Sequence, residues 1–451
     1  MKTQLRARHK AGRAGSSRLD ALRRPDFRRF FIGFTTSELG TAMSATATTF
    51  AILDSGKSAA DLGYVMAAGI VPIVLCLLGG GVFADRIGSR RVMLGADCVR
   101  CLAQTALAVA LFTTRPPLWV FIVLVMVRSA GEGFFTPALS ALTPQLLGRG
   151  NTTDANALMK MAGSSADVAG PALSGILVAF LGPAAVVALD AASYLVSIFT
   201  LWSIRVANPA PALRDRHGSV FADLREGWTE FRSRAWIWVT TLQFGLFNLL
   251  VWAPFLVLGP VIAHQRYGGA KAWGLTMACY GAGSILGGIA MLGRRPRRPM
   301  VVATIATFGY ACPSIALGLS APVVGTAIAV FIAGIGSTVC NTLYSATSQQ
   351  LLPPTVLARV NSYSTLGSFV LGPLGLAAAG PVALAIGIPR VLLFGAMWQV
   401  CASAVILCLP TIRIEWGPSL VAAAAAAAPI PLPVASSDSP LVAVERLGEG
   451  G

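Results

Sequence analysis

The sequence predicts an all-α integral membrane protein, with twelve transmembrane helices arranged as two pseudo-symmetric six-helix bundles. Composition gives the class: 55% of the 451 residues are hydrophobic, 12% are charged, and the mean hydropathy is +0.69. The chain is therefore more apolar than an average soluble domain. Apolar runs long enough to cross a bilayer recur along it, and a weak internal repeat indicates the two bundles.

The apolar runs define the spans, to within several residues at each end. The 47 glycines and 27 prolines of the chain fit this assignment, because neighbouring membrane helices satisfy the backbone groups that glycine and proline free. The predicted spans are 30–53, 62–84, 91–113, 118–141, 157–181, 184–204, 236–263, 272–293, 299–319, 322–345, 360–382 and 388–410.

Five segments follow from these spans. They are a basic arm (1–29), a first bundle (30–204), a linker (205–235), a second bundle (236–410) and a C-terminal tail (411–451). In the linker, Val220, Leu224, Trp228 and Phe231 recur at helical spacing among charged residues, which predicts an amphipathic surface helix. The tail passes from an alanine run to a proline-rich segment, so we expect it to be flexible.

The net charge of +16 gathers at one side of the predicted membrane. Ten Lys/Arg lie in 1–29, six in 205–235 and four in 294–298, and alternate links carry far fewer. This asymmetry is typical of cytoplasmic against exterior loops, so we expect both termini in the cytoplasm of a multi-pass cell-membrane protein. The same distribution of charge argues against nucleic acid as the partner. In addition, no aromatic residues interleave with the basic residues of the N-terminal arm. We expect no cleavable signal segment.

The two predicted bundles share short motifs at an offset near 205 residues. Residues 145–147 (Gln-Leu-Leu), followed by Asn156, match residues 350–352, followed by Asn361. Glycine-proline pairs in the fifth and eleventh spans form a second match, for which we expect a role in helix packing: Gly170, Pro171, Gly372 and Pro373. Parallel repeats of this kind are one of the architectures of membrane transporters, in which a substrate cavity lies at the interface of the repeats.

A polar link between the second and third spans carries the most specific motif. Its six defining residues are Gly81, Asp85, Arg86, Gly88, Arg90 and Arg91. This pattern resembles the motif between the second and third helices of the major facilitator superfamily of transporters, with Ser89 where that family usually has a base. The resemblance covers 22–410 and implies alternating access, with these residues at a cytoplasmic gate and no cofactor.

Several further stretches resemble the branch that holds macrolide-efflux proteins and the enterobactin exporter, within the drug:proton antiporters. They lie at 24–30, 97–100, 128–131, 137–144, 190–194 and 223–227. The resemblance implies a proton-coupled efflux transporter that exports a small amphipathic drug or secondary metabolite, with protons, solute and lipid as its partners. A siderophore or other metabolite exporter is the alternative within the superfamily, and a non-transporting receptor or scaffold is the alternative outside it. We expect a monomer.

No acidic residue occurs between Glu230 and Glu415, so all carboxylates within spans belong to the first half. Such groups are costly in a membrane and usually face a cavity or a partner. Glu38 lies on a polar stripe with Ser37, Thr41 and Ser44, which favours a proton or substrate site; pairing with an arginine near the interface is the alternative.

Arg128 and Glu132 share a helical face, as either a coupling pair or a structural ion pair. Asp167 precedes Gly170 and Pro171 in a setting that resembles an antiporter motif; it is a further coupling candidate, with hydrogen bonding within the bundle as the alternative. We place Asp97 and Arg100 in the network of the cytoplasmic gate. Asp190 is interpreted as a helix-end contact.

Uncharged side chains of the second half are candidates for the opposite cavity wall, with ordinary packing between helices as the alternative. They are Gln243, Asn248, Trp252, Asn341 and Tyr344.

Enzyme chemistry is not indicated. The three histidines, His9, His217 and His264, all lie outside the middle of the spans, so no histidine metal cluster is expected within the membrane. The eight cysteines fall in predicted spans. We interpret the pair Cys98 and Cys101 as small residues that pack between helices. Residues 51–58 fit a relaxed phosphate-loop pattern but lack the strand that this mechanism needs.

Overall fold

The computed structural model describes residues 20–147, 152–204, 228–229, 231–352 and 354–410, and nearly all of them are helical. The first bundle follows a short helix α2 (Asp20–Arg23). Its six long helices are α3 (Pro25–Asp54), α4 (Ala59–Ile87), α5 (Ser89–Thr113), α6 (Leu118–Leu147), α7 (Thr152–Leu181) and α8 (Pro183–Ser203).

The second bundle also crosses six times, but three of its crossings are interrupted. The first is α10 (Ala235–Phe247), η1 (Asn248–Trp252) and α11 (Ala253–Arg266), and the third is α13 (Pro299–Thr307), η2 (Phe308–Tyr310) and α14 (Ala311–Gly318). The fifth consists of α16 (Pro354–Phe369) and α17 (Gly372–Ile386). The continuous ones are α12 (Ala270–Met291), α15 (Val323–Leu351) and α18 (Ile388–Cys408).

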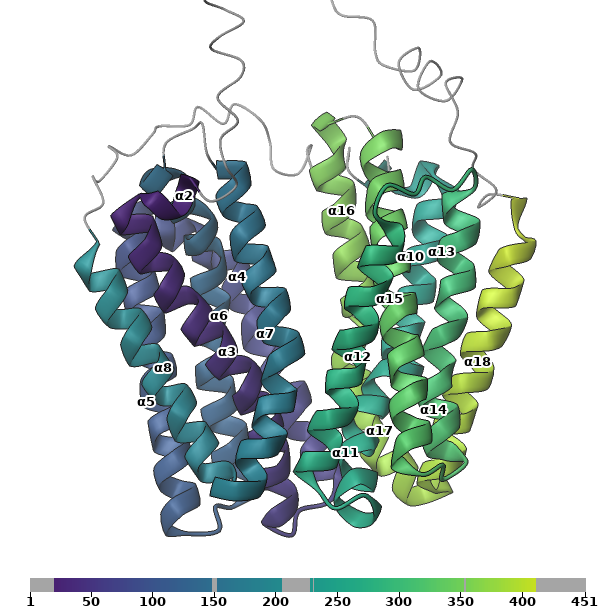
Figure 1. Ribbon diagram of the computed structural model, residues 1–451, viewed down its shortest axis with the longest axis horizontal. Coiled ribbons are helices and arrows are strands. Elements are labelled where there is room, and N and C mark those ends of the chain that lie inside the picture. Colours follow the sequence, from purple (N-terminus) through teal and green to yellow (C-terminus); the bar gives the residue numbers. More distant parts are fainter. Residues whose placement is uncertain (1–19, 148–151, 205–227, 230, 353, 411–451) are drawn as a thin grey trace, which may run out of the picture.

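The predicted fold class is confirmed: the described chain is a helical membrane protein in two six-helix bundles (Figure 1). Eleven of its helical segments are long and apolar enough to cross a membrane by length and composition. The twelfth crossing, α3, is 30 residues long but is not among them. Its middle carries Ser37, Glu38, Thr41 and Ser44, which lower its hydropathy and mark it as a helix that faces a polar interior.

The interruption in the first crossing of the second bundle has a local cause. The turn η1 has the wider hydrogen-bond pattern of a π-helix, and Pro254 follows it. Proline has no backbone N–H, so the helical ladder must be rearranged in the turn before it. The rearrangement turns Asn248 and Trp252 toward the interior of the bundle, where both line a cavity.

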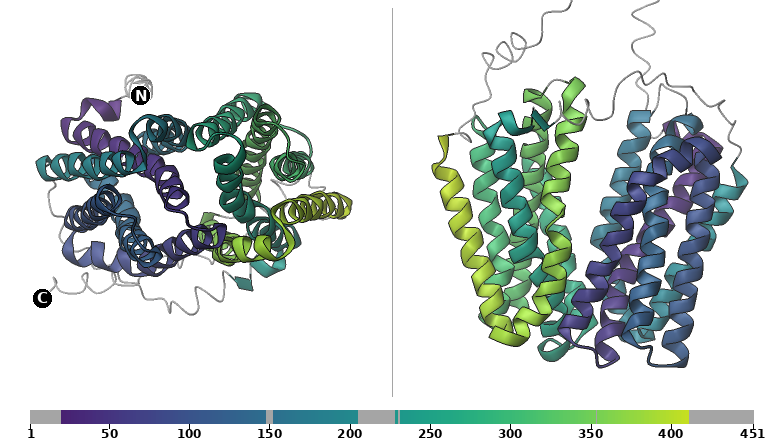
Figure 2. Two further views of the ribbon diagram at one scale, coloured as in Figure 1. Left: turned by 90° about the horizontal axis from the view of Figure 1, so that it is seen from below. Right: turned by 180° about the vertical axis from the view of Figure 1, so that it is seen from behind.

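The two bundles meet at one end of the molecule and splay apart toward the other, as both side views show (Figures 1 and 2). We call the first the sealed end, at which α3 ends and α4 begins. The other is the open end, which holds the α4–α5 link. At the sealed end α7 packs on α12, α4 packs on α17, and α11 contacts α3 and α4.

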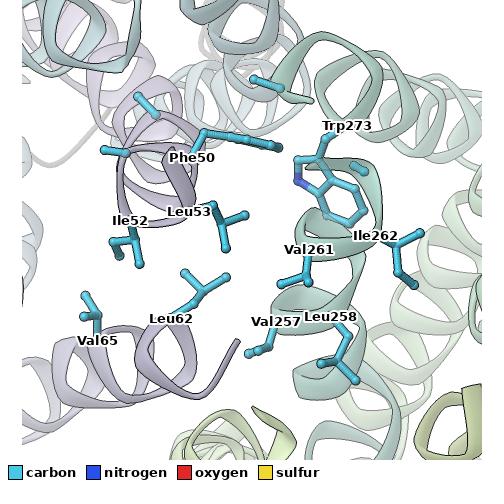
Figure 3. Packing of buried hydrophobic residues seen from close by; sticks show 14 of the residues in the cluster. Phe50, Ile52, Leu53, Leu62, Val65, Val257, Leu258, Val261, Ile262 and Trp273 are labelled. Carbon is cyan, nitrogen blue, oxygen red and sulfur yellow. The ribbon is translucent and has the colours of Figure 1, made fainter. Parts of the chain in front are cut away.

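Apolar side chains fill the sealed end between the bundles (Figure 3). We call this cluster the apolar seal. Phe50, Leu53 and Leu62 come from the first bundle, and their partners from α11 include Val257, Leu258 and Val261. All six are buried, with at most 7% of each residue exposed. Water is therefore excluded between the halves at this end.

Glycines let the helices of the two halves approach closely. A Cβ placed on Gly274 of α12 would lie 2.5 Å from the carbonyl oxygen of Pro171 in α7. A Cβ placed on Gly175 of α7 would likewise lie 2.5 Å from the carbonyl oxygen of Ala270 in α12. Gly170 serves packing within the first bundle, against Ala42 of α3. Gly372 does not: a Cβ there would meet nothing within 4 Å. The expected packing role for Gly372 is wrong, because it opens α17 after the break at 370–371.

Candidate transport site and gate

Buried polar residues cross the interior of the first bundle. Asp97 of α5 is fully buried, and its carboxylate lies between two donors: Oδ1 is 3.2 Å from Nη1 of Arg100, and Oδ2 accepts a hydrogen bond from Ser197 of α8 at 2.6 Å. The side chain of Asp85 lies outside the described set, so the place of Asp97 and Arg100 in the gate network stays a prediction. The described contacts hold Asp97 to α8 and Arg100 to α3 and α8.

Arg100 is 1% exposed and has contacts on four helices. Its Nη2 donates to Oγ1 of Thr41 on α3 at 3.1 Å, and that hydroxyl is 2.8 Å from the hydroxyl of Tyr194 on α8. The guanidinium lies over the ring of Tyr194 at 4.4 Å and over that of Phe135 on α6 at 5.2 Å. Stacking of this kind stabilises a buried cation.

Asp190 belongs to the same interior, which corrects its interpretation as a helix-end contact. It is fully buried in α8, where it accepts a hydrogen bond from Nε2 of Gln104 on α5, and Gln104 also bonds to Ser44 of α3. One signal in the sequence could have found it. Asp97, Arg100 and Gln104 follow at spacings of three and four, so they form a polar face on α5 that needs polar partners.

Three other carboxylates lie close enough to act on one another's charge, and two of their helices, α3 and α7, contact the second bundle. Glu38 of α3 is half-buried, Glu132 of α6 is half-buried and Asp167 of α7 is exposed. Glu132 pairs with Arg128, Oε2 to Nη1 at 3.5 Å. Glu38 has no hydrogen-bond or ion-pair partner among the described residues, although Glu132, Arg100 and Asp167 are close enough to act on its charge.

The charges deep in the first bundle do not balance. Away from the ends of its spans, where Arg91 and Lys160 lie, the first bundle holds two arginines, Arg100 and Arg128, against five carboxylates. Asp97 and Asp190 are the fully buried acids, and we interpret them as structural counter-ions of the two arginines. The remaining three acids lie near one another on α3, α6 and α7, so this part of the first bundle carries excess negative charge.

The facing wall of the second bundle contains a cavity of about 320 Å³. No charged side chain is among its lining residues in the described chain. Four of the five predicted residues line it: Asn248, Trp252, Asn341 and Tyr344. Gln243 does not, because it is buried on the side of α18, where its amide donates to Ser403 at 3.4 Å.

Aromatic side chains that sequence reasoning missed make up much of this cavity. They are Phe244, Phe247, Phe255, Tyr280 and Tyr310. The rings of Phe247 and Tyr310 are 4.7 Å apart, and Trp252 contacts Phe247, Phe255 and Tyr280 at 5.6 to 6.4 Å. These residues come from three separate crossings, so no periodicity within one span could have grouped them.

The two asparagines present the same kind of atom to the cavity. The amide nitrogen of Asn248 donates to the carbonyl oxygens of Phe244 and Ser368, each at 3.0 Å. That of Asn341 donates to the carbonyl oxygen of Ser337 at 3.0 Å. With the donors engaged, the side-chain oxygens remain as acceptors. Aromatic faces and acceptors both favour a solute with positive charge or N–H groups.

The link at the open end is built around a glycine turn. Gly88 has φ of 95°, a conformation that glycine adopts without strain. Arg90 then donates to the carbonyl oxygens of Leu201 and Trp202 at 2.8 and 2.7 Å, and so satisfies the end of α8. Arg86 and Arg91 are exposed. The surroundings of Gly81 and the side chain of Asp85 lie outside the described set.

Comparison with known proteins agrees with this architecture. The family model for transmembrane secretion effectors matches residues 16–439. The chain belongs to this family of the major facilitator superfamily. Macrolide efflux protein A of Streptococcus pyogenes is 22% identical over 395 residues, covering 86% of this chain and 94% of that protein. The multidrug efflux pump Tap of Mycolicibacterium fortuitum is 24% identical, covering 84% and 94%.

Solved transporters share the fold at low identity. A bacterial homologue of the lysosomal transporter Spinster gives a TM-score of 0.66 at 15% identity, covering 90% of this chain and all of that one. The nucleoside transporter NupG gives 0.66 at 13% identity, covering 84% and 97%. The chain is thus a multi-pass membrane transporter of the efflux type and not an enzyme. Among its described residues, no group of histidine, cysteine and acidic side chains could hold a metal.

Proposed function

We propose that this transporter exports a small amphipathic cation in exchange for protons by alternating access. The observation that carries the proposal is the division of charge between the facing walls. Glu38, Glu132 and Asp167 provide excess negative charge on one side, and an aromatic cavity without charged lining residues lies on the other. An amphipathic cation suits both walls at once.

The negative wall also supports exchange. A half-buried carboxylate can hold either a proton or the charge of a solute, and occupation by one disfavours the other. Glu38 has no partner among the described residues, so it is the group most available for this exchange. Glu132 is the second, because Arg128 engages one of its oxygens.

Sidedness follows from the basic residues. The exposed arginines of the α4–α5 link and of 294–298 lie at the open end, and cytoplasmic loops are enriched in such residues. The open end therefore faces the cytoplasm in this proposal, and the structure corresponds to an inward-open state ready to take up a solute. The names of the relatives, macrolide efflux protein and multidrug efflux pump, support a drug-like solute.

The test measures transport in inverted membrane vesicles energised by a proton gradient, with ethidium and a macrolide as probes. We expect accumulation that a protonophore abolishes. Glu38→Gln should retain ethidium binding but lose the dependence of transport on pH, because the amide mimics only the protonated carboxyl. Ser174→Ala, which removes one buried hydrogen bond to the carbonyl of Met43, is the matched control. Protonophore-resistant accumulation, or unchanged pH dependence in Glu38→Gln and Glu132→Gln, contradicts the proposal.

A further inference from the structure

A groove opens on the outer surface of the second bundle, between the starts of α12 and α15. These two helices pack on each other (Figure 1), and near the sealed end they border a cavity of about 270 Å³. Leu275 of α12 is 47% exposed and Val324 of α15 is 65% exposed. Because the apolar seal fills the space between the bundles at this end, side chains exposed here face outward. The groove therefore lies on the lipid-facing surface of two membrane-crossing helices.

Two hydrogen bonds hold the mouth of the groove in shape. The hydroxyl of Tyr267, in the turn between α11 and α12, donates to the carbonyl oxygen of Ala321 at 2.5 Å and lies 3.2 Å from Oγ1 of Thr326 on α15. Its neighbour Arg266 donates to the hydroxyl of Ser320 at 2.6 Å. The turn before α12 is thus tied to the turn before α15, and the groove between the two helices is preformed.

The groove is apolar along its length and positively charged at its mouth. Leu275 and Cys279 of α12 line it together with Val324 and Ala327 of α15. Lys271 lies in the first turn of α12 and is the only charged residue among the lining residues that the structure describes. From Lys271 to Cys279 the helix rises about 12 Å, most of one leaflet of a hydrocarbon core about 30 Å thick. A molecule with a chain-like tail can therefore lie along the groove with its polar end at Lys271.

Lys271 has no acidic side chain to neutralise it. The sequence contains no Asp or Glu between 231 and 414, and no carboxylate forms an ion pair with Lys271 in the described part of the chain. The basic groups near it are engaged elsewhere, since Arg266 bonds to Ser320 and His264 lies 3.5 Å from Asp54. A basic residue near the membrane surface attracts anionic lipid, and the described residues offer Lys271 no competing anion.

We propose that this groove binds an anionic phospholipid, with its phosphate on Lys271 and one acyl chain between α12 and α15. The ammonium group donates charge-assisted hydrogen bonds to the phosphate oxygens, and the apolar walls accommodate the chain. A zwitterionic lipid binds less tightly, because its own cation offsets the attraction to Lys271. The site lies outside the space between the bundles, so it is independent of the proposed exchange of solute and protons.

Native mass spectrometry of the full chain in detergent tests the proposal, with phosphatidylglycerol or phosphatidylcholine of the same acyl chains as the titrated lipid. We expect phosphatidylglycerol to bind about fivefold more tightly, the effect of one basic residue near the surface. Lys271→Gln should remove this preference, whereas Lys57→Gln, in the α3–α4 turn at the same end, should keep it. Ala327→Phe fills the groove and should weaken binding of both lipids. Ala404→Phe, exposed on α18, is its control.

A phosphatidylglycerol with a photoactivatable group in one acyl chain locates the bound lipid, and its label should concentrate in residues 271–279 and 323–327. Label spread evenly over the exposed helices, equal affinity for the two lipids, or a preference that persists in Lys271→Gln overturns the proposal. A dimer that Ala327→Phe abolishes also overturns it and assigns the groove to a second copy of the chain. Lys271→Gln exchanges one exposed polar side chain for another, so it decides the question even if Ala327→Phe does not fold.

Discussion

Gly274→Ala should open the sealed end of the molecule. The new Cβ would lie 2.5 Å from the carbonyl oxygen of Pro171 and 2.9 Å from Cα of Gly175, whereas ordinary contacts begin at 3.4 Å. Both obstructing atoms belong to the backbone of α7, so no side chain can turn away. The α7–α12 contact must lengthen by about 0.9 Å, or the halves must part.

The size of the effect follows from the nature of the clash. Overpacking of this kind costs about 1 to 3 kcal/mol, and the cost applies only while α7 and α12 are in contact. The gain in helix propensity from Gly to Ala is common to both states and cancels. Since 1.4 kcal/mol is a factor of ten, the equilibrium should shift roughly 5- to 150-fold toward the state with the sealed end open.

Spin labels at Arg115 and Arg390, exposed at the sealed end of the two bundles, measure the shift as a longer distance population. Gly95→Ala is the matched control, because a Cβ there meets nothing within 4 Å. Distance distributions that coincide for the two variants would refute the reasoning, since they would show that α7 and α12 absorb the methyl group without separation of the halves.

Three further predictions follow. Trp252→Ala removes an aromatic face of the cavity and should weaken ethidium binding about tenfold, measured by fluorescence titration, with exposed Trp119→Ala as the control. Arg90→Gln frees the end of α8 and should lower the melting temperature in detergent by a few degrees, with little change in ethidium affinity. Asp54 lies 3.5 Å from His264 across the sealed end. His264→Gln weakens this contact, so the Arg115–Arg390 label pair should report a larger share of long distances than in the parent.

The sequence was a good guide to the helices because hydropathy is a property of each segment alone. The predicted span 62–84 lies within α4, Ala59–Ile87, and 118–141 lies within α6, Leu118–Leu147. The helices extend beyond the apolar runs by one or two turns, since polar residues continue a helix outside the hydrocarbon layer. The π-type turn at Asn248–Trp252 is harder to predict: Pro254 indicates that the helix is disturbed near it but does not by itself specify the wider hydrogen-bond pattern.

The sequence identified residues of the candidate site only where the chemistry of a side chain by itself restricts where that side chain can lie in a membrane protein. A carboxylate in a span must find a cavity or partner, so Glu38 and Glu132 were identifiable. Aromatic side chains pack against lipid as readily as they line a cavity, so the sequence did not identify Tyr280 and Tyr310 as cavity residues. The hydrogen bond between Asp97 and Ser197 could not be predicted either, because the two residues are a hundred positions apart in the sequence.

The division of charge between the bundles has a consequence for exchange under the proposed function. A cation in the space between the halves has electrostatic partners on one wall only, and a proton bound there competes for the same charge. Two unit charges 10 Å apart interact by about 1.7 kcal/mol at an effective dielectric constant of 20, which is roughly 17-fold in affinity. A proton on Glu132 can therefore weaken binding of a cation beside Glu38 without touching it. A carboxylate in the second bundle would have let the solute keep one partner while the other was protonated, and its absence between 231 and 414 makes exchange, rather than joint binding, the natural result.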